Sequence, residues 1–225
     1  MELVLKNEDV VSLLNSIKEA NLAYQEDKQS HIKDFAKAQS PMCTLVMCCD
    51  SRAHSTSFTY NPENNFFIVR NIGNQYILNQ GCVEYGVRVL NTPLLIFLGH
   101  TACGAVKASM GNYGNLHSSI IREIDHLALS IQKSDISTSC SAEERWRDAV
   151  INNVNQQVEL AIKDFADLRL SKTLAVLGMV LDIDNSIGNG YGTISLINLN
   201  GETDKVKLAN NNFVKVFFNN IELTH

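Results

Sequence analysis

The chain has 225 residues, of which 45% are hydrophobic and 19% are charged, with only 3 prolines and 12 glycines. This composition excludes a disordered or collagen-like chain and predicts a globular protein. Lysine and arginine (19) are outnumbered by aspartate and glutamate (24), which gives a net charge of −5, and no basic block interrupts the mixture. A nucleic acid or an anionic membrane therefore has no electrostatic support as a partner, and we expect a small-molecule ligand.

The amino-terminal sequence and the cysteines indicate the compartment. Residues 1–11 (MELVLKNEDVV) are acidic and amphipathic, without the basic start and apolar core of a signal peptide. No apolar run reaches the roughly 18 residues that a membrane-spanning helix needs. We therefore expect a cytoplasmic protein, in which the six cysteines stay reduced and serve metal binding or catalysis rather than disulfides.

The first predicted elements are one or two amphipathic helices, because apolar residues recur at helical spacing from about residue 9 to residue 37. We expect these helices to lie on a surface or on a partner subunit. After Pro41 the run CTLVMCC predicts a short buried strand, which ends abruptly at the polar segment DSRAHSTS. The run FFIVRN predicts a second strand.

The rest of the chain alternates between helices and strands. Residues 79–90 predict a helix, TPLLIFLG a third buried strand, and HTACGAVKASM a turn that opens another helix. A helical stretch at about 142–168 precedes a fourth strand, TLAVLGMVLD. This order predicts an α/β fold with a mainly parallel sheet. The polar residues 132–141 predict a mobile loop that is too short for a linker, so we expect one domain over residues 1–225, with residues 1–40 as a helical arm.

Three potential metal ligands follow two of the predicted strands. Cys48 ends the first strand, whereas His100 and Cys103 follow the third. In parallel sheets ligands collect at the carboxyl ends of the strands, so these side chains are expected to converge. Two cysteines and one histidine resemble a zinc site, and three protein ligands leave a fourth position open, as in catalytic zinc sites. The sequence therefore predicts a catalytic Zn²⁺.

Two charged residues accompany the first ligand. If the strand stays extended, Cys48, Asp50 and Arg52 project to one face, because they are spaced by two, and Cys49 points to the other. Arg52 can hold Asp50 in a charge-assisted pair. Asp50 would then accept the proton of a zinc-bound hydroxide in a hydrogen bond, or would itself be a fourth ligand. His54 continues the spacing and could relay protons in an extended chain.

Each of these residues also has a purely structural interpretation. A free cysteine in an apolar strand is more often a small core residue than a ligand. We adopt that interpretation for Cys43, Cys49, Cys82 and Cys140. Asp50 and Arg52 could be a helix cap and a surface pair.

Four motifs occur in a fixed order: MCCDSR, IVRNIGN, GCVEYGVRVL and GHTACGAVKA. They match the pattern C-x-D-x-R, R-N, E-Y and G-H-x-x-C-G, and over about residues 21–185 the chain resembles the β-class carbonic anhydrases. The resemblance implies zinc held by Cys48, His100 and Cys103, with an Asp50–Arg52 pair beside it. It also implies a zinc lyase, carbonate dehydratase, which reversibly hydrates carbon dioxide to bicarbonate and a proton.

The resemblance extends to the sheet, the assembly and the pocket. It implies a four- or five-stranded, mainly parallel sheet in an obligate homodimer, often paired into a homotetramer, with active sites at the subunit interface. Plant-type members line the pocket with residues that correspond to Gln39, Phe67, Ile72 and Tyr85. Part of this wall comes from the neighbouring subunit, so the dimer would be required for catalysis. Alternatively, Phe67, Ile72 and Tyr85 are ordinary core residues.

Another branch of the family is inhibited by bicarbonate in a noncatalytic pocket and can close its zinc with the aspartate. That branch uses a tryptophan, an arginine and a tyrosine where this chain has Leu45, Arg70 and Leu181. Two of the three are missing, so we expect an open zinc with Asp50 paired to Arg52. A pH-driven switch, in which Asp50 closes the zinc at low pH, stays open as an alternative.

Three other functions stay open at this point. Hydrolysis of carbonyl sulfide or carbon disulfide needs the same zinc chemistry, with a different entrance tunnel to the active site. A noncatalytic zinc-binding homologue is disfavoured by Asp50, Arg52 and Gln39, because a structural site closes its fourth position with a protein ligand. A flavodoxin-like module with buried cysteines would bind no metal.

Overall fold

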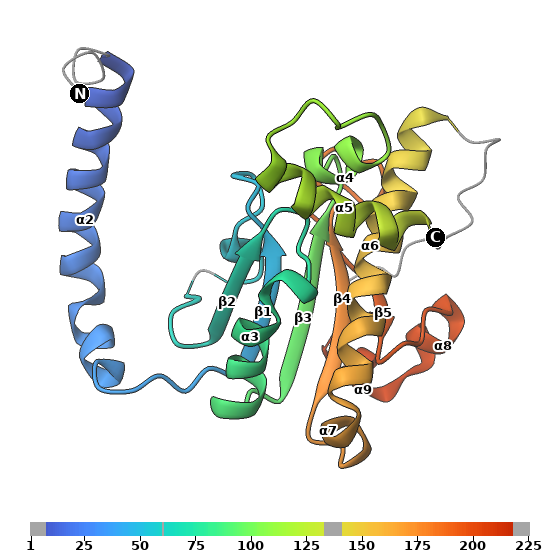
Figure 1. The fold of residues 1–225 in the computed structure, drawn as a ribbon. Coiled ribbons are helices and arrows are strands. Elements are labelled where there is room, and N and C mark those ends of the chain that lie inside the picture. Colours follow the sequence, from blue (N-terminus) through green and yellow to red (C-terminus); the bar gives the residue numbers. More distant parts are fainter. Residues whose placement is uncertain (1–7, 60, 133–140, 218–225) are drawn as a thin grey trace. The chain divides into compact units, whose positions relative to one another are not determined.

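The computed structural model describes residues 8–59, 61–132 and 141–217, and the chain divides into two compact units, Met1–Ser40 and Pro41–His225. The first unit contains α2 (Glu8–Phe35), which confirms the predicted helical segment as one long helix (Figure 1). Six of its large apolar side chains are exposed: Val11, Leu13, Leu14, Ile17, Leu22 and Tyr24. Among the described residues, every helix is too short or too polar to cross a membrane.

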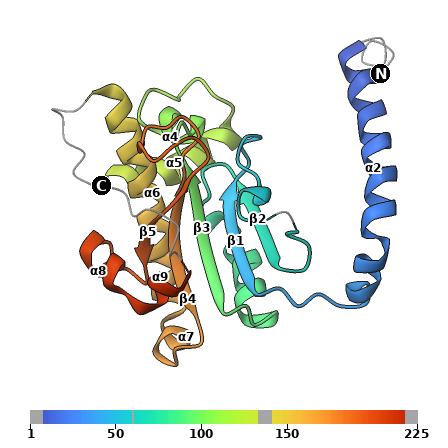
Figure 2. The ribbon, with the colours of Figure 1, turned by 180° about the vertical axis from the view of Figure 1, so that it is seen from behind.

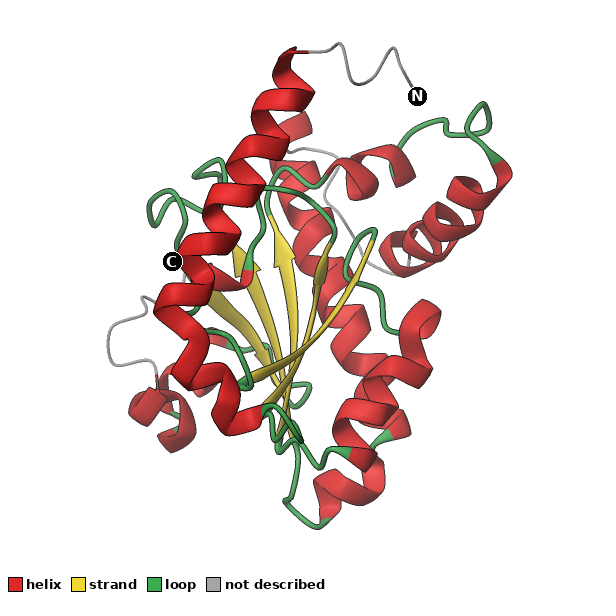
Figure 3. Ribbon diagram, turned by 90° about the vertical axis from the view of Figure 1, so that its left-hand side faces the viewer, coloured by secondary structure: helices red, strands yellow, loops and turns green. Residues whose placement is uncertain are grey.

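The second unit is built on a five-stranded sheet with the order β2-β1-β3-β4-β5 (Figures 1 and 2). The strands are β1 (Cys43–Cys48), β2 (Phe66–Asn71), β3 (Leu94–His100), β4 (Ala175–Leu181) and β5 (Ile194–Leu199). The first four pair in parallel, as predicted, and β5 pairs with β4 in the antiparallel direction. Figure 3 shows the arrowheads of the parallel strands pointing to the same edge of the sheet.

The helices of the second unit are α3 (Gln80–Glu84), α4 (Gly104–Ser109), α5 (Ser118–Gln132), α6 (Ala142–Asp164), α7 (Ala166–Leu170), α8 (Lys205–Asn210) and α9 (Asn212–Phe217). The helix predicted at 79–90 consists of α3 and a π-helical turn, Tyr85–Val89. The one predicted at 142–168 consists of α6, which a Ser141–Glu144 capping box begins, and α7. Most of the predicted loop 132–141 lies outside the described residues.

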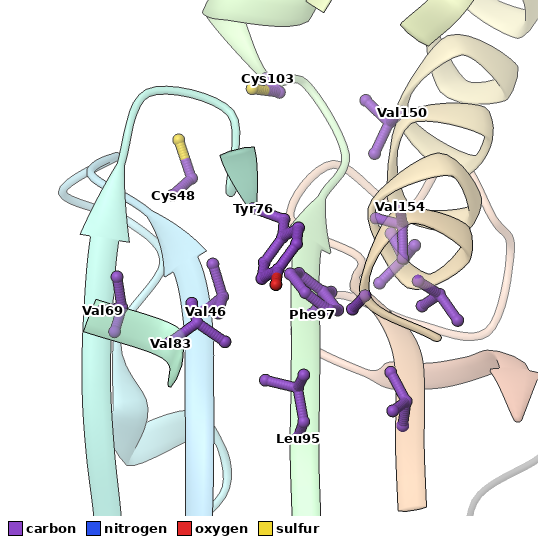
Figure 4. Packing of buried hydrophobic residues seen from close by; sticks show 14 of the residues in the cluster. Val46, Cys48, Val69, Tyr76, Val83, Leu95, Phe97, Cys103, Val150 and Val154 are labelled. Carbon is purple, nitrogen blue, oxygen red and sulfur yellow. The ribbon is translucent and has the colours of Figure 1, made fainter. Parts of the chain in front are cut away.

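Both faces of the sheet are buried at β1, β3 and β4, which explains why these strands are continuous apolar runs. On β1, Val46 and Cys48 belong to one core cluster and Leu45 and Met47 to another, because alternate side chains point to opposite faces. Figure 4 shows the first cluster, which lies between the sheet and α6. The site described below is at the upper end of this cluster, where β1 and β3 end.

Helix α6 approaches the sheet closely because two strand positions lack a side chain. A Cβ atom at Gly99 of β3 would collide with Cγ2 of Val154, and one at Gly178 of β4 would lie 2.9 Å from Cγ1 of the same valine. Val154 is fully buried and, as a β-branched residue on a helix, has little rotamer freedom. The two glycines therefore set the distance between α6 and the end of β3, where His100 follows Gly99.

We expect Gly99→Ala to destabilise the protein by about 1–3 kcal/mol, because the added methyl group overpacks the contact with Val154. The matched control is Gly81→Ala on α3, where no heavy atom lies within 4 Å of the new Cβ. That control should be neutral or stabilising by about 1 kcal/mol, as alanine favours helix. Denaturant unfolding measures both changes, and equal stabilities of the two variants would contradict the packing argument.

Candidate metal centre

Three metal-binding side chains meet at the carboxyl edge of the sheet. Cys48 ends β1, His100 ends β3, and Cys103 immediately precedes α4. All three are buried, and their ligand atoms lie within 4.8 Å of one another. Figure 4 shows the sulfur atoms of Cys48 and Cys103 at the ends of their two chain segments. The structure thus brings together the three residues that the sequence singled out.

The sulfur of Cys48 lies in an environment that favours a thiolate. It lies within 4.8 Å of the Cys103 sulfur and of a ring nitrogen of His100, and it accepts a hydrogen bond from the backbone N–H of Gly73 at 3.4 Å. These contacts hold the pKa of the Cys48 thiol well below its usual range, whereas the contact with Cys48 raises the pKa of Cys103. Metal ions bind the thiolate form, so a lowered thiol pKa at Cys48 favours metal binding.

The imidazole of His100 has one nitrogen satisfied and one available. Its Nδ1 lies 2.9 Å from the carbonyl oxygen of Thr101, which can only accept, so Nδ1 carries the proton. Its Nε2 is buried and has no hydrogen-bond partner among the described residues. An unshared imidazole lone pair beside two sulfurs is the ligand set that Zn²⁺ favours, so these residues fit a zinc ion.

Asp50 and Arg52 form a two-pronged ion pair beside these ligands. Arg52 Nε donates to Asp50 Oδ1 at 2.9 Å, and Nη2 donates to Oδ2 at 2.8 Å. The guanidinium holds the pKa of Asp50 well below its usual range, so the carboxylate stays ionised. Arg52 Nη2 also donates to the carbonyl of Ala102, at 3.1 Å, which connects the pair to the loop between His100 and Cys103.

The expected extended path from Cys48 to Arg52 is wrong. Strand β1 ends at Cys48, and a turn follows, in which the N–H of Ala53 donates to the carbonyl of Asp50. Asp50 and Arg52 are therefore brought together by the turn and not by strand alternation. The proton relay through His54 depended on the extended path, and His54 is instead exposed, with its ring against Thr56.

Arg70 is a structural part of this site that the sequence did not reveal as such. From β2 its guanidinium donates to the carbonyls of Cys48, Asp50 and Ala53 at 2.7–3.0 Å. It thereby fixes the turn that carries Asp50. The R-N pattern marked Arg70, but nothing local in the sequence showed that its partners are main-chain oxygens.

The structure brings together two of the four expected pocket residues. The rings of Phe67 and Tyr85 lie 5.9 Å apart at 37°. Tyr85 is 47% exposed, so its interpretation as an ordinary core residue is wrong. Ile72 is half-buried, and Gln39 belongs to the first compact unit. That these two complete the pocket wall stays a prediction.

The other cysteines divide into two groups. Cys43 is a buried core residue, as expected, and burial raises the pKa of its thiol. Cys49 and Cys82 are exposed, so their assignment to the core is wrong. Cys49 follows the end of β1 instead of lying within it, and Cys82 lies on the solvent side of α3. Cys140 lies outside the described residues.

A family model described as carbonic anhydrase matches residues 43–188, more than half of the chain. The chain therefore belongs to the carbonic anhydrase family, and its curated relatives and structural neighbours identify the β class. Carbonic anhydrase 2 of Mycobacterium tuberculosis is 31% identical over 132 residues, which cover 53% of this chain and 63% of that protein. The mitochondrial beta carbonic anhydrase 6 of Arabidopsis thaliana is 24% identical over 173 residues, 70% of this chain and 60% of that protein. The matches thus span less than two thirds of these relatives.

Solved structures confirm the fold at lower sequence identity. The Coccomyxa β-carbonic anhydrase, solved in complex with acetazolamide, has a TM-score of 0.72 and 21% identity, and the match covers 97% of this chain and all of that one. A structure from a study of two tetrameric β-carbonic anhydrases of Sordaria macrospora has a TM-score of 0.69 and 21% identity, with 84% of this chain and 98% of that one covered.

We expect Cys48→Ala to abolish stoichiometric metal binding, because the cluster loses one of its three ligands. The matched control, Cys49→Ala, removes an exposed neighbouring thiol and should leave the metal content unchanged. Elemental analysis of both variants, purified without added metal, measures the difference. Loss of metal from the Cys49 variant alone would contradict the assignment of the ligand set.

Proposed function

We propose that this protein is a zinc-dependent carbonate dehydratase, which reversibly hydrates carbon dioxide to bicarbonate and a proton. The observation that carries the proposal is the buried cluster of Cys48, His100 and Cys103, with an unshared imidazole nitrogen, next to the Asp50–Arg52 pair. Membership of the carbonic anhydrase family supports this reaction among those that such a site can perform.

Cys48, His100 and Cys103 would hold the zinc ion. When bound, zinc supplies Lewis acidity, which lowers the pKa of a coordinated water from about 15.7 toward about 7. Three protein ligands would leave the fourth position of the metal to solvent, as in catalytic zinc sites. Burial of all three ligands keeps the surroundings of this position at low dielectric, which strengthens the electrostatic contacts made there.

Asp50 would act as a fixed hydrogen-bond acceptor. Its Oδ2 lies 3.8 Å from Nε2 of His100 and therefore faces the ligand cluster, while a single hydrogen bond from Arg52 leaves it a free lone pair. An ionised carboxylate can accept a proton in a hydrogen bond but cannot donate one. Asp50 thus orients an attacking hydroxyl group and disfavours anions that carry no proton. Arg52 holds this acceptor in place and ionised.

The apolar wall would receive the carbon dioxide. Phe67 and Tyr85 supply a pair of aromatic rings, and we propose that Ile72 extends this surface. Gln39 would hydrogen-bond an oxygen of the substrate or of bicarbonate. A weakly polar substrate needs such a surface, because it offers few groups for directional contacts.

We expect Asp50→Asn to retain zinc but to lower the rate of carbon dioxide hydration by on the order of 10²-fold, because the amide can turn a donor toward the site. Asp125→Asn, which changes an exposed carboxylate on α5, is the control and should leave the rate unchanged. Stopped-flow assays at pH 7 and pH 8.5, with zinc content measured on the same samples, provide the test.

Three results would each contradict a different part of the proposal: the role of Asp50, the open metal site or the reaction itself. Unchanged turnover in Asp50→Asn would refute the role of that carboxylate. Turnover of the wild type at pH 8.5 alone would indicate that Asp50 closes the metal at lower pH. A zinc-loaded wild type without turnover at either pH would instead favour a carbonyl sulfide or carbon disulfide hydrolase, or a noncatalytic homologue.

We further propose that residues 1–40 are an arm that packs on the partner subunit of a cytoplasmic homodimer. Pairing of two such dimers would give a tetramer, the assembly named for the Sordaria enzymes. The exposed apolar residues of α2, among them Leu13, Leu14 and Ile17, support this role. Such a stripe on a helix requires a covering surface, because its exposure to water is unfavourable.

The double variant Leu13→Glu/Ile17→Glu should therefore sediment as a monomer and lose hydration activity. Ser16→Glu places a charge beside the apolar stripe on the same helix and should leave the dimer intact. Sedimentation velocity and activity are measured at equal concentration. An active monomer would show that the site is complete without its neighbour, and an unchanged dimer would show that the arm lies elsewhere.

A further inference from the structure

A completely buried carboxylate lies close to the metal centre without being part of the ligand set. Asp182 follows directly after β4 and has no exposed surface. Its Oδ1 accepts from the hydroxyl of Thr101 at 3.1 Å, and its Oδ2 from the N–H of Ile187 at 3.0 Å. Among the described ion pairs, none includes Asp182. Because the side chain of an aspartate is rarely buried completely, its presence requires an explanation.

The hydroxyl of Thr101 connects this carboxylate to the end of β3. Besides donating to Asp182, Oγ1 accepts from the N–H groups of Ile183, at 2.8 Å, and Asp184, at 3.3 Å. The N–H of Thr101 donates to the carbonyl of Leu181 at 2.9 Å. Thr101 is fully buried. The hydrogen bonds of its hydroxyl and N–H groups therefore fix the orientation of its backbone, including that of its carbonyl.

The carbonyl of Thr101 is the acceptor that faces His100. Its distance of 2.9 Å from Nδ1 requires the proton on that nitrogen, because a carbonyl oxygen cannot donate. The neutral imidazole then has its lone pair on Nε2, the atom without a partner. The orientation of one carbonyl thus decides which nitrogen His100 can offer to a metal.

We propose that Thr101 and Asp182 are positioning residues, which lock His100 in the tautomer and ring orientation that bind the metal. The inference rests on the proposed zinc site. A carboxylate suits this task because it accepts from both of its donors. An amide at position 182 would turn an N–H group toward either Thr101 Oγ1 or the N–H of Ile187. Asp182 also joins the ends of β3 and β4, which are neighbours in the sheet.

The first test is the zinc affinity of variants, measured by competition with a chromophoric chelator. Thr101→Val keeps the shape of the residue but removes the hydroxyl, and we expect the affinity to fall by about 10–100-fold, the usual effect of losing an outer partner of a ligand. Thr101→Ser keeps the hydroxyl and should restore the affinity to near that of the wild type.

The matched control is Thr44→Val. Thr44 is likewise a fully buried threonine of the same sheet, with its hydroxyl 2.7 Å from that of Thr92, but it lies near the amino end of β1. The same chemical change there should leave zinc affinity unchanged, although it removes a buried hydrogen bond. This control separates positioning of His100 from a general loss of stability.

The second test reads the tautomer directly in metal-free protein. In ¹⁵N-histidine spectra we expect His100 of the wild type and of Thr101→Ser to show a protonated Nδ1 and an unprotonated Nε2. Thr101→Val and Asp182→Asn should show a mixture of both tautomers. The His100 signals are assigned by their absence in His100→Gln. This readout on the wild type holds even if a variant does not fold.

The outcomes distinguish the inference from the function on which it rests. Wild-type zinc affinity in Thr101→Val, or a protonated Nε2 in the metal-free wild type, would overturn the positioning role while leaving the metal centre in place. Failure of the wild type to bind zinc would overturn the proposed function. Weakened affinity in Thr101→Val together with mixed tautomers, with Thr44→Val unaffected, would support the inference.

Discussion

The structure depends on holding two thiols and an imidazole nitrogen at one buried point. Each group belongs to the end of a different segment: β1 for Cys48, β3 for His100 and the start of α4 for Cys103. An unpartnered buried polar atom costs about 1–3 kcal/mol, so Nε2 of His100 would only destabilise a fold that never bound a cation. The arrangement is understandable when a metal ion supplies the missing partner, since binding then contributes to folding.

To bring the three ligands together, the backbone that carries them adopts an unfavourable conformation and leaves carbonyl groups that need hydrogen-bond donors. Ala102, between the second and third ligands, adopts the left-handed conformation (φ 54°), which costs a residue with a side chain roughly 1–2 kcal/mol. Side-chain donors hold the carbonyls of these loops: Arg52 binds that of Ala102, Arg70 three in the turn after β1, and the indole of Trp146 that of Cys103. Main-chain oxygens beyond a strand end need such partners, because the sheet no longer supplies them. The ligands and the Asp50–Arg52 pair therefore form one rigid unit.

The sequence predicts features that leave a local pattern of residues, but not contacts between residues that lie far apart in the chain. The apolar runs predicted four strands and their parallel arrangement, because burial on both faces leaves a local signal, and the motifs predicted the ligand set. The turn at Asp50 was missed because alternation of side chains holds only while the chain is hydrogen-bonded to a neighbouring strand, and β1 ends at Cys48. The contact of Thr101 with Asp182 joins residues 81 positions apart, so no local sequence pattern predicts it. Strand β5 was also not identified, since its residues follow a glycine-rich segment that offers no periodic signal.

Charge balance at the site links the ligand set to the pair beside it. With both thiols ionised, Cys48, Cys103 and Asp50 carry three negative charges, and Arg52 carries one positive charge, which leaves two negative charges for a divalent cation to balance. Arg52 contacts both oxygens of Asp50, so the guanidinium and not the metal neutralises that carboxylate. The cation is then left to the two thiolates, whose charge it matches. An aspartate neutralised in this way would have no electrostatic reason to become a fourth ligand, and it would stay available as an acceptor. An open coordination position would thus follow from the same distribution of charge that pairs Asp50 with Arg52.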